Sequence, residues 1–435
     1  MTKEILKNII PSMLATLFTG FYVIVDGLFI GQSVGGIGLA AINVAWPIAA
    51  FIQALGVAIG TACGIYISYY RSKNDNKKIE VVMANSLIIL LIYILLMMSL
   101  FFYKEELLRL IGANSETMAM ATDYIKVYIL ASSIQIIGCA TIPVLRNFGY
   151  YKTAAILLFI ATLFNFLGDY IFIMVLNHGI MGAAIASVIS QAVVMIVGVI
   201  ILIKNKCIKL NFKIRFKYLL GLFLNGIAPF ILTFSASFLI IIYNLFCLKY
   251  GGNDAVAAYT VVAYIIYTAQ YISIGISDGL QPLLTYHYGL NDGKVNKYFY
   301  KTLMILVGLL GLLTLMFSFM RMPFANLFNV QDEARNIYSD SYFYFIFSFI
   351  PIGLIRIYAA RFYSTNLNVK ADIIVLIEPI ITPIILFLFT MWIGINGIWL
   401  SYLIIQIALG LISILIAKIP IKELNFSKID IEDID

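Results

Sequence analysis

Long apolar runs separated by short polar segments follow one another along the whole chain. The runs at 86–102, 303–319 and 373–393 are each near the ~20 residues that a helix needs to cross a bilayer. The sequence has no succession of strands with alternating apolar and polar residues, which favours a helical bundle. Division at the polar and Gly/Asn-rich segments predicts twelve membrane-spanning helices, over residues 9–31, 39–70, 81–103, 118–146, 153–176, 180–203, 218–249, 255–288, 299–320, 334–364, 370–393 and 397–418.

Composition identifies lipid as the main solvent of the folded chain. Of its 435 residues, 62% are hydrophobic and 12% are charged, whereas a soluble domain carries roughly 25% charged residues. The first apolar run continues through Pro11 and Asp26 without a small-residue cleavage site, so we expect a retained helix and not a signal peptide. The four cysteines lack CxxC spacing and there are two histidines, so we expect no disulfide framework, metal centre or organic cofactor.

The basic residues are distributed unevenly between the two sides of the predicted bundle. With a cytoplasmic N-terminus, 23 of the 29 lysines and arginines fall inside and 6 outside. This bias predicts a multi-pass protein of the cell membrane with both termini cytoplasmic. It also accounts for the net charge of +7 without a nucleic-acid partner. The densest basic cluster, at 204–217, is interpreted as a linker that contacts anionic lipid.

The two halves of the chain repeat each other at an offset of about 217 residues. Each half holds six predicted spans, so both halves enter the membrane in the same sense and are related by a pseudo-twofold axis along the membrane normal. We therefore expect an all-α polytopic protein with an N-lobe (1–205), a basic linker (206–217), a C-lobe (218–420) and a short acidic tail (421–435). The repeat pairs Pro11 with Pro229, Asp26 with Asn244, Ala40-Ala41 with Ala257-Ala258, Lys152 with Lys370 and Gln191 with Gln406.

Five segments together resemble the MATE family, multidrug and toxic compound extrusion. They are YVIVDGLFIGQSVGGIGLAAINVAWPI (22–48), LRNFGYYKTA (145–154), NFLGDYIFI (165–173), GIMGAAIASVISQ (179–191) and GLQPLLTYHYG (279–289). The block around Gln281-Pro282, before an Asn-rich loop, is most similar to the DinF-like branch. The resemblance implies a monomeric antiporter that exports small amphipathic or cationic compounds in exchange for Na⁺ or H⁺.

The resemblance also implies a cation site in the N-lobe, and four residues match it. DinF-like members use an Asp on helix 1, an Asn and an Asp on helix 5, and a hydroxyl on helix 6, which correspond to Asp26, Asn165, Asp169 and Ser187. An intramembrane carboxylate costs at least ~2.5 kcal/mol, so it indicates function by default. Oxygen ligands suit a hard cation, and paired carboxylates suit a proton equally well. The alternative is that the two acids bond neighbours near helix ends and that the serine bonds its own backbone.

Other polar or helix-bending residues are candidates outside that set. Pro11 is either a hinge or a static kink close to a helix start. The helix at 218–249 has no acidic residue, and its counterpart of Asp26 is Asn244, which argues against a cation site there. Asp278, Gln281 and Glu378 remain as candidates for a substrate site in the C-lobe, with pairing of Glu378 to Arg356 or Arg361 as the alternative.

Two other functional classes are alternatives to an antiporter. A membrane enzyme would need paired acids such as DDxxD or His-rich metal spacing, and neither is present in the sequence. A flippase of lipid-linked sugars is the closer rival, since such proteins resemble MATE transporters in fold. Many are expected to carry extra helices and an arginine-lined cavity, whereas this chain has twelve predicted spans and three intramembrane arginines, Arg146, Arg356 and Arg361.

Overall fold

The computed structural model describes residues 1–207, 213–328 and 332–420, so the predicted tail (421–435) and part of the predicted linker lie outside the described residues. Helices and turns make up the whole of this described part. In chain order the elements are α1 (Thr2–Ser33), α2 (Gly36–Ser72), α3 (Asn76–Ser99), η1 (Leu100–Tyr103), α4 (Lys104–Ile111), α5 (Met118–Leu130), α6 (Ser132–Asn147), α7 (Tyr151–Asp169), η2 (Tyr170–Val175), α8 (Gly179–Lys204), α9 (Phe216–Leu290), α10 (Val295–Ser318), α11 (Arg321–Leu327), α12 (Asp332–Ile346), α13 (Phe349–Ser364), α14 (Asn368–Ile393) and α15 (Ile395–Lys418).

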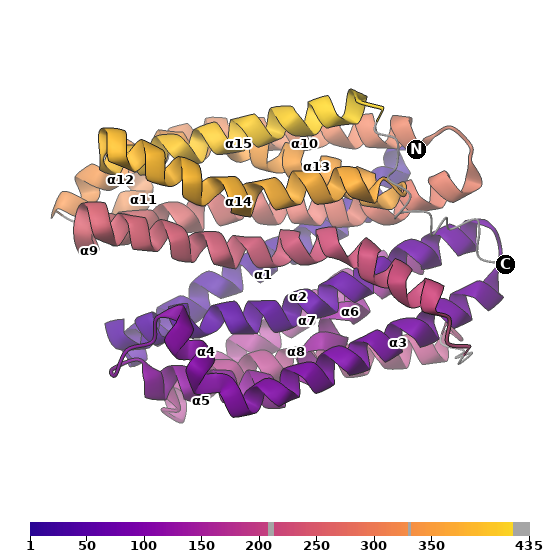
Figure 1. Cartoon of the computed structure of the whole chain (residues 1–435), viewed down its shortest axis with the longest axis horizontal. Coiled ribbons are helices and arrows are strands. Elements are labelled where there is room, and N and C mark those ends of the chain that lie inside the picture. Colours follow the sequence, from indigo (N-terminus) through magenta and orange to yellow (C-terminus); the bar gives the residue numbers. More distant parts are fainter. Residues whose placement is uncertain (208–212, 329–331, 421–435) are drawn as a thin grey trace.

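The helices supply the twelve predicted membrane spans. Within the described ranges, nine helices are long and apolar enough to cross a bilayer. Two further spans each consist of a bent pair, α5 with α6 at 62° and α12 with α13 at 42°. The 75-residue α9 supplies two spans, because Gly252 interrupts it with φ 63° and ψ −157°, a conformation that only glycine adopts easily. The chain folds back at this point, so both ends of α9 lie on the same side of the molecule (Figure 1).

The structure differs from the predicted elements in local details. Pro11 lies in the interior of α1, and not close to its start, because the helix begins at Thr2. The predicted continuous helices at 118–146 and 334–364 are each broken in two. Short helices α4 and α11 were not predicted, since both are too short for an apolar run to mark them.

Two hydrophobic cores correspond to the two lobes. One core collects buried side chains from α2 to α8, among them Tyr66 and Tyr128, and the other collects those from α9 to α15, among them Trp399. Figure 1 shows the two helix layers with α1 and the first part of α9 between them. Side chains exchange between the cores: Ile5 and Ile9 of α1 join the C-lobe core, and Tyr218 joins the N-lobe core.

Glycines of α9 allow α1 to pack closely against the C-lobe. A Cβ atom at Gly275 would lie 2.4 Å from Met13 Cα, and one at Gly279 would lie 2.8 Å from Ile9 Cα. Both obstacles are backbone atoms, so no side-chain rotation can relieve them. The spacing of four residues between the two glycines is the small-xxx-small pattern that brings membrane helices together.

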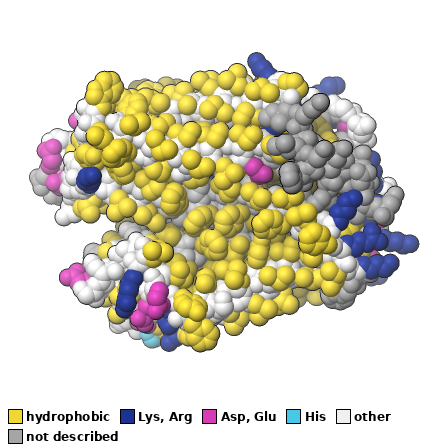
Figure 2. Space-filling model, viewed as in Figure 1, with side chains coloured by type: hydrophobic (Ala, Val, Ile, Leu, Met, Phe, Trp, Pro, Cys, Tyr) yellow, Lys and Arg dark blue, Asp and Glu magenta, His cyan; other side chains and the backbone are white. Residues whose placement is uncertain are grey.

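The molecular surface shows where lipid and water contact the protein. In Figure 2, hydrophobic side chains cover the middle of the molecule, and most of the visible lysines and arginines gather at the end that holds Met1 and the end of α15, the two termini of the described chain. At the opposite end the two lobes separate, and the surface is hollowed between them. The lobes are therefore parted at this end of the molecule.

Candidate functional site

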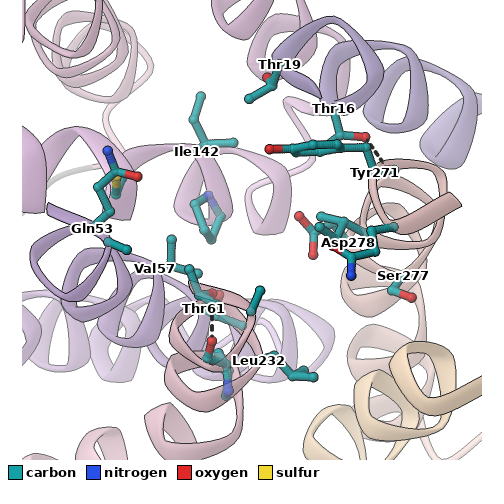
Figure 3. Close-up of a pocket in the computed structure, with 18 of the residues that line it drawn as sticks. Thr16, Thr19, Gln53, Val57, Thr61, Ile142, Leu232, Tyr271, Ser277 and Asp278 are labelled. Carbon is teal, nitrogen blue, oxygen red and sulfur yellow. Dashed lines mark hydrogen bonds between the residues drawn. The ribbon is translucent and has the colours of Figure 1, made fainter. Parts of the chain in front are cut away.

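A cavity of about 350 Å³ lies between the two lobes. The N-lobe contributes lining residues from α1, α2, α6, α7 and α8, and the C-lobe contributes them from α9 and α13. Thr16, Gln53 and Thr61 face it from the N-lobe, and Tyr271 and Asp278 face it from the C-lobe (Figure 3). The Thr16 hydroxyl donates to the Tyr271 carbonyl oxygen at 2.9 Å, which joins the two lobes at the cavity wall.

An ion pair between the lobes closes the end of the cavity nearer the termini. Arg146 Nη1 of α6 lies 2.6 Å from Asp278 Oδ2 of α9. The Arg146 side chain is 6% exposed and the Asp278 side chain 37% exposed. Arg146 also lines a second pocket, on the side where Met1 and Lys3 lie. The ion pair is thus the partition between the cavity and the terminal side of the protein.

A pair of amides strengthens this partition. Asn147 Nδ2 donates to Gln281 Oε1 at 2.8 Å, and Gln281 Nε2 donates back to Asn147 Oδ1 at 3.2 Å. Ser68 also donates to Asn147 Oδ1, at 2.6 Å. Asn147 and Gln281 are both buried, so their hydrogen bonds do not compete with bulk water. We call Arg146, Asp278, Asn147 and Gln281 the inter-lobe clasp.

The four residues of the predicted cation site lie on three N-lobe helices that pack together. Asp26 is on α1, Asn165 and Asp169 are on α7, and Ser187 is on α8; α7 packs against both other helices. Asn165 Nδ2 donates to Ser187 Oγ at 3.3 Å, and Asp26 and Asp169 are close enough for their charges to interact. None of the four lines the large cavity. We call them the N-lobe cluster.

The N-lobe cluster contains polar oxygens that lack hydrogen-bond donors. One buried side-chain oxygen each of Asp26, Asn165 and Asp169 has no partner. Directly after Asp169 the chain forms the π-helical segment η2, a geometry common at functional sites. Tyr128, 1% exposed, lies near both carboxylates and was missed by the sequence reasoning, because its apolar surroundings resemble those of any core tyrosine.

The C-lobe candidates are separated from one another. Asp278 and Gln281 belong to the inter-lobe clasp, whereas Glu378 of α14 accepts a hydrogen bond from Gln406 Nε2 at 2.7 Å. Neither arginine proposed as a partner of Glu378 pairs with it: Arg356 donates to the Leu232 carbonyl and Arg361 to Asn296 Oδ1, each at 2.8 Å. Asn244, on α9, has a buried side-chain oxygen without a partner, as its counterpart Asp26 does.

The clasp was the main feature that the sequence reasoning missed. Arg146 was counted as an intramembrane arginine but was given no partner, and Asn147 was not singled out. Their partners lie 132 and 134 residues away along the chain. The available signal was the placement of both pairs in the motifs LRNFG and DGLQP, each at a predicted cytoplasmic helix end.

Comparison with known proteins identifies the family. The MatE family model matches residues 11–171 and again residues 229–388, once in each lobe. The chain belongs to the MatE family. The second match begins at Pro229, the residue that the internal repeat pairs with Pro11. MATE proteins are transporters, so this chain is a multi-pass membrane transport protein and not an enzyme; its assignment to the DinF-like branch remains a prediction.

Relatives of this MATE protein are similar over almost their whole length. The multidrug export protein MepA of Staphylococcus aureus (strain MSSA476) is 24% identical over 420 residues, which cover 95% of this chain and 93% of MepA. MepA of Staphylococcus saprophyticus is 22% identical over 428 residues, which cover 97% of this chain and 94% of that MepA. A multidrug resistance MATE family transporter solved in an outward-facing conformation has a TM-score of 0.88 at 19% identity, over 95% of this chain and 94% of that one. These relatives support multidrug efflux transport as the general role.

Proposed function

We propose that this MATE protein is a cation-coupled antiporter that exports small amphipathic compounds by alternating access, with Na⁺ or H⁺ as the coupling ion. The observation that carries the proposal is the N-lobe cluster. Asp26 and Asp169 are close together within a membrane-spanning lobe, and each has a buried oxygen without a hydrogen-bond donor. Two such carboxylates cannot both remain ionised unless a cation or a proton compensates one of them.

The ligand chemistry of the cluster fits a hard monovalent cation or a proton. Its polar atoms are the carboxylates of Asp26 and Asp169, the amide oxygen of Asn165 and the hydroxyl of Ser187. Oxygen ligands of this kind suit hard cations. Among the described residues no group of three or more His, Cys, Asp or Glu side chains is placed to hold a metal ion, which disfavours a tight transition-metal site. Loading and unloading of one cation would change the charge of the lobe interior by a full unit.

Helix α1 provides a route from the cluster to the C-lobe. Asp26 lies toward one end of α1, while Met13 and Thr16 of the same helix contact α9. Pro11, in the helix interior, removes one backbone hydrogen bond and makes a change of bend less costly there. A cation that alters the position of Asp26 would therefore bias the contacts of α1 with α9. We assign Pro11 as the hinge.

The shape of the molecule supports alternating access. The lobes part at the end away from Met1 (Figure 2). The contacts of the inter-lobe clasp close the other end. The lysines and arginines gathered near the termini indicate by the positive-inside bias that this closed end is cytoplasmic. In this assignment the structure is the outward-open state of a monomer, and opening of the clasp produces the inward-open state.

Reconstitution tests the proposal. Purified protein in liposomes should move an amphipathic fluorescent dye, tested in cationic and anionic forms, in response to an imposed Na⁺ or pH gradient. Asp26→Asn should abolish this coupling while the protein remains folded by size-exclusion chromatography. Asp123→Asn, a change at an exposed acid of α5, is the matched control and should transport normally. Wild-type efflux by the Asp26→Asn protein under both gradients would rule out the N-lobe cluster as the coupling site and move attention to Asp278 and Glu378.

A further inference from the structure

The charged side chains that line the inter-lobe cavity do not balance. Three described lining residues are charged: Arg146, Asp278 and Arg356. Arg146 and Asp278 neutralise each other across 2.6 Å in the clasp. Arg356 has no carboxylate within salt-bridge distance among the residues that the structure describes. The described side chains that line the cavity therefore carry a net charge of +1.

Arg356 is anchored in a way that leaves most of its hydrogen-bonding capacity unused. The residue lies in α13, and its Nη2 donates to the Leu232 carbonyl oxygen of α9 at 2.8 Å. A guanidinium has five N–H donors in a rigid planar arrangement, and this is the one hydrogen bond described for it. The bond fixes the group beside the cavity wall, where Leu232 is also a lining residue.

Glu378, a second acid whose charge acts on Arg356, is hydrogen-bonded elsewhere. Gln406 donates to Glu378 at 2.7 Å, and Arg356 and Glu378 together line a separate pocket of about 70 Å³. One water molecule needs a cavity volume of roughly 10–15 Å³, so this pocket has room for more than one. The two charges influence each other through space but form no ion pair. Arg356 thus borders both this small pocket and the large cavity, and it is the charge that a ligand in the cavity meets.

We propose that the transported substrate class is an amphipathic organic anion whose carboxylate or sulfonate binds Arg356. This deepens the proposed transport function and rests on it. A guanidinium without an ion-pair partner inside a membrane protein is costly, and a carboxylate or sulfonate supplies two oxygens that accept parallel hydrogen bonds from it. Tyr267 and Tyr271 together with apolar residues such as Ile240 and Ile274 line the cavity and can receive the apolar body of the same molecule.

A cationic substrate would find a much poorer site in this cavity. Its one lining carboxylate, Asp278, already accepts the ion pair from Arg146. A bound cation would have to compete with that arginine and would weaken the clasp that closes the cavity. The family resemblance implies amphipathic or cationic substrates. The charges that line this cavity favour an amphipathic substrate, and specifically one that carries a negative group.

Two dyes on one xanthene scaffold test the sign of the preferred charge. Fluorescein is anionic and tetramethylrhodamine methyl ester is cationic, and the binding of each to the purified protein is followed by fluorescence anisotropy without any gradient. The wild-type protein should bind fluorescein about tenfold more tightly than it binds the cationic dye. Arg356→Gln should lose about tenfold in fluorescein affinity, the effect of removing one charge-assisted hydrogen bond worth about 1.4 kcal/mol, and should bind the cationic dye no worse. Arg356→Lys should keep part of the affinity, because it retains the charge but not the planar donors.

Arg361→Gln is the matched control. Arg361 lies on the same helix, contacts Asn296 and the Phe299 ring, and does not line the cavity, so fluorescein affinity should not change. Equal or tighter binding of the cationic dye by wild type would overturn the proposal, and this comparison needs no variant to fold. Unchanged fluorescein affinity in folded Arg356→Gln would also overturn it. The transport proposal is judged separately. Gradient-driven efflux of the cationic dye alone would support coupled transport and contradict the anionic substrate class. Fluorescein binding without coupled efflux of either dye would support the anion site and contradict coupled transport.

Discussion

At the scale of single residues, the grouping of four polar side chains in the N-lobe could be predicted from the sequence, whereas the partners of individual charges could not. Asp26, Asn165, Asp169 and Ser187 were selected by motif and by the cost of polar groups in lipid, and the structure brings them together on adjacent helices. The role of these residues as a coupling site remains a prediction. The partner of Asp278 was not predictable, because an ion pair between residues 132 positions apart leaves no periodic signal in the sequence.

The ligands of the N-lobe cluster should not contribute equally. Asp169→Asn removes a charge and should reduce coupled efflux almost as much as Asp26→Asn does. Ser187→Ala removes one neutral ligand and should weaken the apparent affinity for the coupling cation by about fivefold, the effect of one ordinary hydrogen bond. Initial efflux rates measured against the concentration of the coupling cation separate the two effects.

Ser190→Ala provides the control for this series. Ser190 lies on the same helix as Ser187, but its hydroxyl donates to the backbone carbonyl of Ser187, one turn earlier in the helix, at 2.9 Å. Its removal should leave the cation dependence unchanged. If Ser190→Ala and Ser187→Ala behave alike, Ser187 is not a ligand.

At the scale of elements, the long apolar helices were predictable and their interruptions were not. Hydropathy located all twelve spans, because each must present about 20 apolar residues to lipid. The break at Ala131 between α5 and α6 and the π-helical turn after Asp169 occur within apolar sequence that would suit a continuous helix. Such breaks depend on packing against other helices, which the local sequence does not encode. The fold-back at Gly252 was predicted as the gap between two spans, since the Gly-Gly-Asn segment marks it.

The close contact of α1 with α9 should be sensitive to any side chain at Gly275. The Cβ of Gly275→Ala would meet Met13 backbone atoms at 2.4 and 2.8 Å, so the two helices must separate. Overpacking of this kind costs typically 1–3 kcal/mol. We expect a lower midpoint of thermal unfolding in detergent. Fluorescence-detected size-exclusion chromatography of heated samples measures this midpoint.

Gly308→Ala serves as the comparison, because a Cβ at Gly308 of α10 would have no neighbour within 4 Å. Its unfolding midpoint should stay at or slightly above that of the wild type, since alanine is the better helix former. Equal midpoints for the two variants would show that α1 and α9 are not in close contact in the purified protein.

At the scale of the whole molecule, the two-lobe architecture followed from the internal repeat, and the conformation did not. Hydropathy and the repeat treat both ends of the cavity alike, so they contain no information on which end is open. The closed end is defined by contacts between side chains of different lobes, such as Asn147 with Gln281. In the alternating-access cycle that we propose, these contacts belong to one state, whereas the same sequence encodes every state.

The inter-lobe clasp should respond to charge reversal as a pair. Arg146→Asp and Asp278→Arg each place like charges opposite one another and should open the end near the termini. The double variant restores an attractive pair and should close it again. Cys139 lines the cavity, so its labelling by a membrane-impermeant maleimide applied from the side of the termini, in a Cys207→Ser background, reports the opening.

Labelling of Cys139 should increase in each single variant and return toward the wild-type rate in the double variant. Lys301→Gln is the control: this half-buried lysine of α10 donates to the Thr2 hydroxyl at 3.3 Å outside the clasp, and its loss should not change labelling. A double variant that labels as fast as the single ones would mean that the ion pair does not hold the lobes together.

The modest size of the clasp has a consequence for the speed of the transport cycle. A neutral hydrogen bond contributes about 1 kcal/mol net and a partly exposed ion pair about as much, so the contacts of Arg146 and Asn147 with α9 amount to a few kcal/mol. Inversion of a two-state population from 1:99 to 99:1 takes about 5.5 kcal/mol. A carrier with a much stronger seal would spend nearly all its time waiting in one orientation, because the binding of one small ion supplies a limited difference in free energy. Turnover is therefore fastest when the clasp is only as strong as is needed to keep solutes from leaking through the cavity.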